Sequence, residues 1–246
     1  MHGSPPFNTA SGPGQWLRSF LFTLCLFLST PVFSGAIVLV FWLPYRYRYL
    51  LTQAWAYSLL WLLKALCRLD YQVEGREHIP SGNHISMWKH SSTWETIAQV
   101  AILPPQAWVL KHELMWIPIV GWAIHLMRPI AIDRGSGGQA VKRVVEQGKQ
   151  RLADGMWVLI FPEGTRVPAG TTRKYGSSGA LLATETGRAV IPVAHNAGAF
   201  WPRRGLLKKP GTIRVVIGPP IDSTGLAPRE LNERVQAWIE STLQRL

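Results

Sequence analysis

The strongest constraint on this chain is a run of 25 consecutive residues without a charged side chain, from Ser19 to Leu43. As a helix, such a run is long enough to cross a hydrocarbon core of about 30 Å, which needs roughly 20 residues. Pro31 and Gly35 lie inside the run. They either kink one spanning helix or divide it into two short halves that enter one leaflet, and hydropathy alone does not choose between these arrangements.

The charge pattern extends this membrane-associated character over the first 68 residues. These residues include five basic side chains and no acidic one, because all 14 acidic residues lie at or after Asp70. The cluster Tyr45-Arg46-Tyr47-Arg48-Tyr49 is typical of segments that anchor at headgroups on the cytoplasmic side, and the apolar stretch from Leu50 to Leu66 suits the membrane interface. A cleaved signal peptide is the other interpretation. The uncharged run exceeds the roughly 7–15 residues of such a signal, and Arg18 provides little of its basic start.

Three segments follow from this pattern. We expect a disordered tail over 1–15, N-terminal membrane-anchoring helices over 16–68, and one domain over 69–246, where short apolar runs alternate with helical patterns and predict an α/β fold. The expected strands are Gln106–Leu110, Pro129–Ile132, Met156–Phe161, Ala189–Ala194 and Thr212–Ile217. The expected helices are Gln139–Leu152 and a C-terminal helix that begins at Pro228, with Leu231, Val235, Trp238 and Leu243 as its apolar stripe.

Composition excludes several classes of protein. A chain that is 47% hydrophobic and 16% charged is too apolar to be disordered throughout, and its two cysteines provide neither a disulfide framework nor a cysteine-based zinc site. The net charge of +12 fits nucleic acid, an anionic membrane or a phosphorylated substrate. Because the basic residues match no nucleic-acid-binding motif, we expect no nucleic-acid partner.

The first polar cluster is Lys89-His90-Ser91-Ser92-Thr93-Trp94-Glu95. His90 and Glu95 are five residues apart, so they can meet when His90 lies in a turn and Glu95 in the first turn of a helix. Ser92 to Glu95 matches a capping box, which is also the purely structural interpretation of Glu95. In the functional interpretation, His90 takes a proton from an attacking hydroxyl and Glu95 holds the imidazole in the correct tautomer.

The second cluster is Phe161-Pro162-Glu163-Gly164-Thr165-Arg166, directly after an apolar strand. It places small, polar and cationic groups at the carboxyl end of a strand, where open α/β sheets bind ligands, and Arg166 offers a planar fork for phosphate oxygens. An ordinary strand-to-loop turn is the other interpretation. Two shorter patterns accompany these clusters. The segment from Ile130 to Arg134 ends a strand in an acid and a base, and Pro192 within Val190–Ala194 indicates an edge strand or a bulge.

Taken together in this order and spacing, the four segments resemble the four blocks of the glycerolipid acyltransferases, and most closely the bacterial branch that acylates 1-acylglycerol-3-phosphate. The resemblance runs from about Arg18 to Ala197. It implies a mixed sheet flanked by helices and preceded by an N-terminal membrane-associated helical segment. One departure is that the first block usually ends in Asp, whereas this chain has Glu95, which keeps the charge and changes the reach.

The resemblance also implies roles for individual residues. It makes His90 the general base and Glu95 its partner, and it makes 69–246 the acyltransferase catalytic domain. The acceptor-binding residues that it implies are Lys111, Arg134, Glu163, Gly164, Thr165 and Arg166. No metal and no organic prosthetic group is implied, since the acyl donor is a co-substrate.

The activity implied by the resemblance is transfer of a fatty acyl group from an acyl thioester of acyl carrier protein or coenzyme A to the 2-hydroxyl of 1-acylglycerol-3-phosphate (lysophosphatidic acid). The product is phosphatidic acid, and the expected location is the bacterial inner membrane, with the site at its cytoplasmic face. Glycerol phosphate or an ornithine lipid is the alternative acceptor. The alternative from another class is a non-catalytic membrane adaptor, which would use Trp201, Arg203, Arg204, Lys208 and Lys209 as a cationic aromatic surface.

Overall fold

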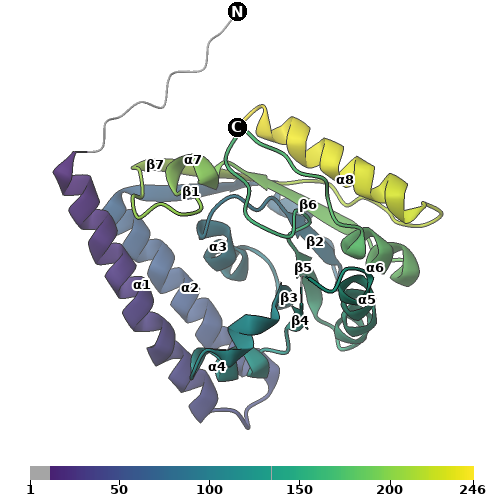
Figure 1. The fold of residues 1–246 in the computed structure, drawn as a ribbon, viewed down its shortest axis with the longest axis horizontal. Coiled ribbons are helices and arrows are strands. Elements are labelled where there is room, and N and C mark those ends of the chain that lie inside the picture. The colour runs from purple at the N-terminus through teal and green to yellow at the C-terminus, as the bar shows by residue number, and fades with distance from the viewer. Residues whose placement is uncertain (1–11, 134) are drawn as a thin grey trace, which may run out of the picture.

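The computed structural model describes residues 12–133 and 135–246, and one seven-stranded sheet organises them (Figure 1). The strands are β1 (Leu69–Glu74), β2 (Ile85–Trp88), β3 (Gln106–Lys111), β4 (Ile130–Ile132), β5 (Trp157–Ile160), β6 (Val190–His195) and β7 (Gly211–Ile217). The α-helices are α1 (Pro13–Leu39), α2 (Tyr45–Cys67), α3 (Trp94–Ile102), α4 (Val120–Leu126), α5 (Gly138–Ala153), α6 (Ser178–Thr186), α7 (Ala197–Phe200) and α8 (Pro228–Leu243). Two short 3-10 helices are η1 (Arg76–His78) and η2 (His112–Trp116).

The strand order is β1-β7-β6-β2-β5-β3-β4. From β6 to β4 the five neighbouring strands are parallel, whereas β7 is antiparallel to β6 and parallel to β1. The predicted mixed sheet is therefore confirmed. Because five strands run the same way, the segments that follow β2, β3, β4 and β5 all emerge at one edge of the sheet.

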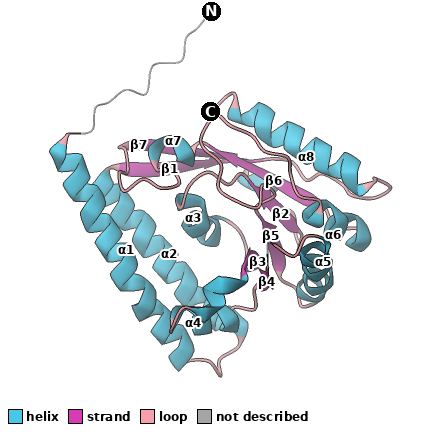
Figure 2. Cartoon of the chain, in the orientation of Figure 1, coloured by secondary structure: helices cyan, strands magenta, loops and turns pink. Residues whose placement is uncertain are grey.

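Helices cover both faces of this sheet, as Figure 2 shows. On one face, α2 and α3 pack against the sheet through residues such as Leu63 and Trp94, and α1 lies outside them against α2. On the other face, α5, α6 and α8 bury Val144, Leu182 and Val235. The site-bearing edge is thus held between two separate apolar cores.

The two N-terminal helices lie side by side and are long and apolar enough to cross a membrane by length and composition (Figure 1). Helix α1 continues through Pro31, so the proline does not divide it. It begins at Pro13, inside the predicted tail, because proline fits the first turn of a helix; residues 1–11 lie outside the described residues. Large apolar side chains cover its outer surface, including Phe27 and Leu28, which are 72% and 61% exposed.

The five predicted strands and the two predicted helices are present, and the predicted ends differ from those of the structure by at most one residue. The pattern missed two strands: β2, which precedes His90, and β1, whose alternating Asp70, Gln72 and Glu74 look like a loop in sequence but pair with β7. Pro192 is also not at an edge, because β6 lies between β7 and β2. It is tolerated because the β6–β7 pairing begins at Val193, and on that side its carbonyl oxygen accepts a hydrogen bond from the Gly218 N–H (2.8 Å).

Candidate active site

His90 lies in the loop between β2 and α3, and Glu95 lies in the first turn of α3. The Nδ1 atom of His90 is 2.9 Å from Oε1 of Glu95, and both side chains are buried. Because a carboxylate only accepts hydrogen bonds, this contact places the proton of a neutral imidazole on Nδ1. The basic lone pair is then on Nε2, and the imidazole ring stacks on Phe161 with 4.0 Å between ring centroids.

Glu95 also serves the backbone, since Oε1 accepts hydrogen bonds from the N–H groups of Ser91 (2.8 Å) and Ser92 (2.7 Å). The capping interpretation and the functional interpretation therefore describe the same carboxylate. Burial alone would raise the pKa of Glu95, but the hydrogen bonds from His90 and from the Ser92 N–H hold that pKa below its usual value. Glu95 is consequently an anion fixed in place beside the imidazole.

A second histidine, His195 at the carboxyl end of β6, completes this buried group. Its Nε2 donates to the Lys89 carbonyl oxygen (2.8 Å) and its Nδ1 accepts from the Ala197 N–H (3.3 Å), which defines a neutral ring. Its Nε2 is also 3.9 Å from Oε2 of Glu95, and burial lowers the pKa of His195. The sequence interpretation overlooked His195. The available signal was that His195 directly follows the predicted strand Ala189–Ala194.

The loop from Phe161 to Arg166 follows β5, the other neighbour of β2. Gly164 has φ +67°, a left-handed conformation that glycine adopts without the strain that a Cβ brings. The Glu163 side chain is buried, and it lines a cavity together with Gly164 and Thr165. Its Oε1 accepts a hydrogen bond from the His90 N–H at 3.3 Å, and burial raises the pKa of Glu163 to about 7 against the opposing effect of Lys89. These contacts position the His90 loop, and the acceptor contact that the resemblance implies for Glu163 stays a prediction.

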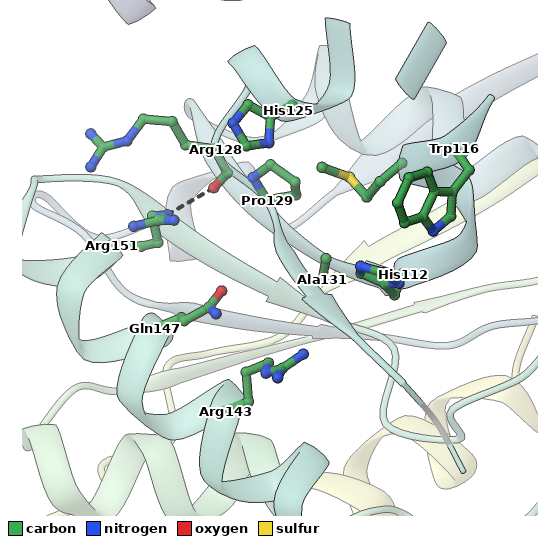
Figure 3. Close-up of a pocket in the computed structure, with 10 residues that line it drawn as sticks. His112, Trp116, His125, Arg128, Pro129, Ala131, Arg143, Gln147 and Arg151 are labelled. Carbon is green, nitrogen blue, oxygen red and sulfur yellow. Dashed lines mark hydrogen bonds between the residues drawn. The ribbon is translucent and has the colours of Figure 1, made fainter. Parts of the chain in front are cut away.

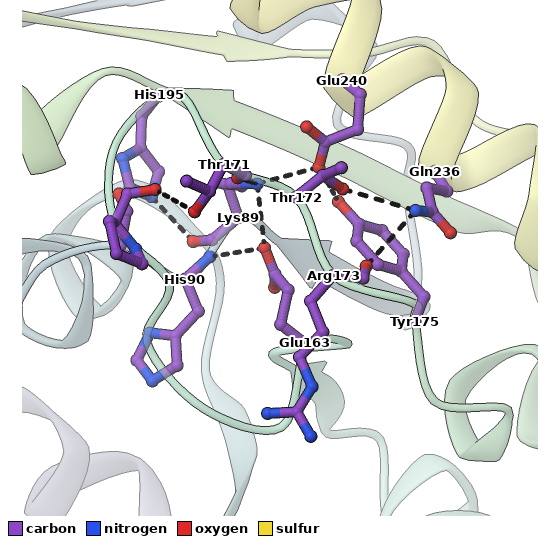
Figure 4. Close-up of polar contacts among 12 residues, drawn as sticks. Lys89, His90, Glu163, Thr171, Thr172, Arg173, Tyr175, His195, Gln236 and Glu240 are labelled. Carbon is purple, nitrogen blue, oxygen red and sulfur yellow. Dashed lines mark hydrogen bonds and ion pairs between the residues drawn. The ribbon is translucent and has the colours of Figure 1, made fainter.

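Lys89 joins this loop to the C-terminal helix α8, as Figure 4 shows. Its Nζ is 2.8 Å from Oε1 of Glu240 and 3.3 Å from Oε1 of Glu163, and it donates to the Thr171 carbonyl oxygen at 3.1 Å. Tyr175 Oη donates to the same Glu240 oxygen at 3.1 Å. A buried cation therefore holds two carboxylates from distant parts of the chain next to His90, and the sequence interpretation gave Lys89 no role.

Arg166, the last residue of this loop, is half-buried, and Arg203 lies nearby. Arg203 Nη1 donates to the Arg166 carbonyl oxygen at 2.9 Å. Burial lowers the pKa of Arg166, Glu95 raises it and Arg203 lowers it further, so these three charges lie within electrostatic reach of one another. Gly164, Thr165, Arg173 and Arg203 line a cavity of about 600 Å³ at this edge. Arg173 and Arg203 were not among the predicted site residues, because neither belongs to a recognised block.

Of the two remaining predicted cations, Lys111 lies further along the same edge. Lys111 ends β3, two strands from β2, which corresponds to about 10 Å at the usual spacing. Its ammonium group is half-exposed and lies 2.5 Å from Oε1 of Glu113. Arg134 lies outside the described residues, directly after the segment that follows β4.

An apolar cavity of about 280 Å³ begins at Phe161, on which His90 stacks. Its walls come from α1, α2, α3, β3 and α4, and include Ser34, Thr96, Val100 and Ala123. A mostly apolar cavity that lies between α1, α2 and the sheet and that shares Phe161 with the stacked imidazole suits an alkyl chain. Within residues 12–133 and 135–246, no group of three or more His, Cys, Asp or Glu side chains is arranged to hold a metal ion.

Of the five residues on which the adaptor alternative depends, two are internal, whereas Arg203 and Arg204 are exposed. Trp201 is buried and meets Phe22 of α1 edge to face at 5.5 Å. Lys208 is also buried, with Nζ 4.7 Å from the centre of the Trp201 ring and hydrogen-bonded to Thr23 of α1. These two residues therefore attach α1 to the domain rather than present a cationic aromatic surface to a partner.

Comparisons with known proteins agree with this arrangement. Residues 70–196 match the model of the Acyltransferase family. The 1-acyl-sn-glycerol-3-phosphate acyltransferase of Pseudomonas aeruginosa is 42% identical over 237 residues, which cover 94% of this chain and 92% of that protein. The human 1-acyl-sn-glycerol-3-phosphate acyltransferase alpha is 26% identical over 172 residues, 69% of this chain and 61% of the human protein.

The fold has a close counterpart among solved structures. The crystal structure of the 1-acyl-sn-glycerophosphate (LPA) acyltransferase from Thermotoga maritima superimposes with a TM-score of 0.78, covering 93% of this chain and 94% of that one at 23% identity. The family model, the bacterial relative and the fold thus agree with the resemblance read from the four blocks. The chain belongs to the acyltransferase family, together with the 1-acyl-sn-glycerol-3-phosphate acyltransferases of that family.

Proposed function

We propose that this protein transfers a fatty acyl group from a thioester to the 2-hydroxyl of 1-acylglycerol-3-phosphate and so makes phosphatidic acid. The observation that carries the proposal is the His90–Glu95 hydrogen bond beside the Phe161 to Arg166 loop, with the His90 ring stacked on Phe161, which lines an apolar cavity. The reaction requires a base for the acceptor hydroxyl, a cationic loop for the acceptor phosphate and a space for the alkyl chain of the acyl thioester.

In the proposed mechanism, His90 Nε2 takes the proton of the 2-hydroxyl while the oxygen attacks the thioester carbonyl carbon. The tetrahedral intermediate collapses with cleavage of the carbon–sulfur bond, and the imidazolium returns its proton to the departing thiolate. Glu95 stabilises the imidazolium and fixes the ring. The oxyanion is stabilised by the Thr165 hydroxyl or by backbone N–H groups of this edge.

The acceptor phosphate is held by cations of the same edge. We propose Arg166, Lys111 and Arg134 for this role, with Gly164 permitting close approach of the backbone. Arg203 is a further candidate, because it lies against Arg166 and shares a cavity with Thr165. Two guanidinium groups provide planar donor pairs that match phosphate oxygens. Glu163 contributes through the His90 backbone, as a positioning residue.

The N-terminal helices are membrane-associated, and we propose that they attach the enzyme to the bacterial inner membrane with the site at its cytoplasmic face. One side of α2 is buried against the domain, at Ala56, Leu59 and Leu63 for example, while the outer side of α1 is apolar and exposed. The pair therefore presents one apolar surface to lipid and keeps the domain at the bilayer surface. Acyl carrier protein and coenzyme A, the two candidate donors, are cytoplasmic carriers.

The test is acyl transfer by the full-length protein in neutral detergent, with His90→Ala compared with His84→Ala. His84 is at the opposite end of the same strand, so it controls for loss of a histidine. Thiol release from an acyl thioester should depend on lysophosphatidic acid, and the lipid product should be phosphatidic acid. We expect His90→Ala to lose at least about a hundredfold of kcat and His84→Ala to retain activity.

Three outcomes would overturn the proposal. Activity retained in His90→Ala would exclude the mechanism. Thiol release that responds to glycerol phosphate or an ornithine lipid instead of lysophosphatidic acid would replace the acceptor. Absence of transfer with every donor and acceptor would favour the non-catalytic adaptor.

A further inference from the structure

A second cationic cavity, of about 730 Å³, lies at the outer edge of the sheet and outside the candidate active site. We call it the edge cavity. Figure 3 shows Arg143, Gln147 and Arg151 on one side of it and His112, Trp116 and His125 on the other. Arg128 and Pro129 close the end that precedes β4.

The edge cavity follows from the position of β4 in the sheet and from the spacing of residues on α5. Strand β4 is the last of the sheet, so its outer side has no neighbouring strand. On α5, positions 143, 147 and 151 are four residues apart and lie on one face of the helix. Helix α5 packs against β4 and turns this face toward the open strand edge, while η2 and α4 form the opposite wall.

The edge cavity has an excess of positive charge, because three arginines line it and no Asp or Glu is among its lining residues. Arg128 forms an ion pair with Asp154 and accepts, at its carbonyl oxygen, a hydrogen bond from Arg151 Nε (2.8 Å). Neither Arg143 nor Arg151 forms an ion pair with a carboxylate in the described part of the chain. By contrast, Lys142 and Lys149 on the neighbouring faces of α5 pair with Glu146 and Glu185.

The edge cavity also lies next to the apolar surface that faces lipid. Trp116, at its rim, is 73% exposed, and Ile117, Ile119 and Trp122 continue the exposed apolar surface along the same segment. Helix α4 in this segment packs against α1. The rings of His112 and Trp116 meet edge to face with 5.8 Å between their centroids. An imidazole and an indole are therefore in contact at the boundary between the apolar surface and the cationic lining.

We propose that the edge cavity binds the phosphate headgroup of an anionic phospholipid of the surrounding bilayer. Arg143 and Arg151 would donate to the phosphate oxygens, and Trp116 would lie at the level of the lipid glycerol and ester groups. Phosphate oxygens match guanidinium donors, and basic pockets beside membrane-inserted segments are known to select anionic headgroups. The lipid of this proposal is separate from an acyl acceptor held at Thr165 and Arg203, because the edge cavity shares no lining residue with the cavity of those two residues; Lys111, which directly precedes His112, lines neither cavity.

The experiment titrates full-length protein in neutral detergent with short-chain phosphatidylglycerol or phosphatidylcholine and follows Trp fluorescence and the thermal unfolding midpoint. Phosphatidylglycerol should bind more tightly than phosphatidylcholine, and added salt should weaken the difference. Arg143→Glu should lower the affinity for phosphatidylglycerol by about tenfold or more, the equivalent of one charge-assisted contact. The matched control, Lys142→Gln with Lys149→Gln, removes two charges of the same helix and should change the affinity less than about twofold.

Arg143 is exposed and Arg143→Glu is therefore expected to fold, which the unfolding midpoint without lipid verifies. Equal affinity of the two lipids, or equal loss in Arg143→Glu and in the lysine control, would overturn the proposal. Free coenzyme A and inorganic phosphate are tested as competitors. If coenzyme A displaces phosphatidylglycerol and Arg143→Glu raises KM for the acyl thioester, the edge cavity is a donor site and the lipid proposal is wrong. Lipid binding is measured without acyl transfer, so its result is independent of the His90→Ala test.

Discussion

Oε1 of Glu95 lies 2.9 Å from Nδ1 of His90. The same oxygen accepts hydrogen bonds from the backbone N–H groups of Ser91 and Ser92, just before helix α3. One oxygen atom therefore orients the imidazole and fixes the loop that carries it. The other oxygen, Oε2, has no hydrogen-bond partner among the described residues and lies 3.9 Å from the neutral His195. Removing the charge of Glu95 and shortening its side chain should consequently have different effects.

We predict that Glu95→Gln keeps the fold and loses activity. The amide oxygen can still accept the backbone N–H groups, but a neutral group no longer stabilises the imidazolium that forms during acyl transfer. We expect kcat to fall by about 10²- to 10⁴-fold, with KM for lysophosphatidic acid changed little. Steady-state kinetics over a range of acceptor concentrations separates the two constants.

Glu95→Asp is the companion variant, because it keeps the charge and removes one methylene. The shorter carboxylate cannot hold both the Ser91 and Ser92 N–H groups and His90 Nδ1 in this backbone, so the start of α3 should lose about 1 kcal/mol of unfolding free energy. Its kcat should fall less than that of Glu95→Gln. A Glu95→Gln protein with undiminished kcat would show that the carboxylate is only a helix cap.

Glu163 should make the stability of the protein depend on pH. Burial raises its folded pKa to about 7 from the ordinary 4.5, so between these values the folded state binds more protons than the unfolded state. The contribution of Glu163 to the free energy of unfolding is therefore fully present below about 4.5 and lost as the pH rises to about 7, by up to about 3 kcal/mol.

Glu163→Gln removes this titration while the amide oxygen still accepts the His90 N–H. The thermal unfolding midpoint, measured from pH 5 to 8 in neutral detergent, should fall more steeply with pH in the parent protein than in the variant. Titrations of other groups affect both proteins equally and cancel in the difference. Parallel curves would mean that Lys89 keeps Glu163 ionised throughout this range.

Local chemistry explains which parts of the site were predictable from the sequence. The His90–Glu95 contact follows from a capping box of four residues, and the place of Phe161–Arg166 at a carboxyl end follows from the predicted strand before it. Both signals are short and contiguous. The approach of the two loops depends on the pairing of β2 with β5, and β2 was not among the predicted strands. The resemblance to known blocks then added roles that no local pattern provides, such as that of Lys111.

The contacts that the sequence did not reveal join residues far apart in the chain. Lys89 and Glu240 are 151 positions apart, and nothing near either residue indicates the other. Arg203 was grouped with its basic and aromatic neighbours, of which Trp201 and Lys208 turned out to be buried against α1. A cationic cluster in sequence does not reveal which members face solvent, because the fold of a loop is decided by the elements packed on it.

The pairing of Lys89 with Glu240 should couple helix α8 to the active-site loop. Lys89→Met leaves the buried Glu163 and the partly exposed Glu240 without their cation, and the loss of one partner of a buried pair costs about 3–5 kcal/mol. Glu240→Gln should cost less, because the Glu240 side chain is 24% exposed and Lys89 keeps Glu163. In the double variant the two losses should not add, since the second change removes a group already left unpaired.

The control on the same helix is Glu230→Gln, which breaks the pair with Arg234, where both side chains are at least half exposed. Such pairs contribute about 0.5 kcal/mol or less. Unfolding midpoints of the four variants give the coupling. If the losses of unfolding free energy for Lys89→Met and Glu240→Gln are additive, the contact between the two residues does not contribute to stability.

Acyl-chain preference should respond to Ser34, which is buried in α1 and lines the apolar cavity that begins at Phe161. Ser34→Phe places a ring in that cavity, so a long acyl chain loses room while a short one still fits. Exclusion of two methylenes costs about 1.6 kcal/mol and should lower the ratio of kcat/KM for long over short acyl thioesters by about tenfold. Leu28→Phe enlarges a side chain of the same helix that is 61% exposed, so its ratio should equal that of the parent protein. If Ser34→Phe slows transfer of all chain lengths equally, this cavity does not hold the acyl chain.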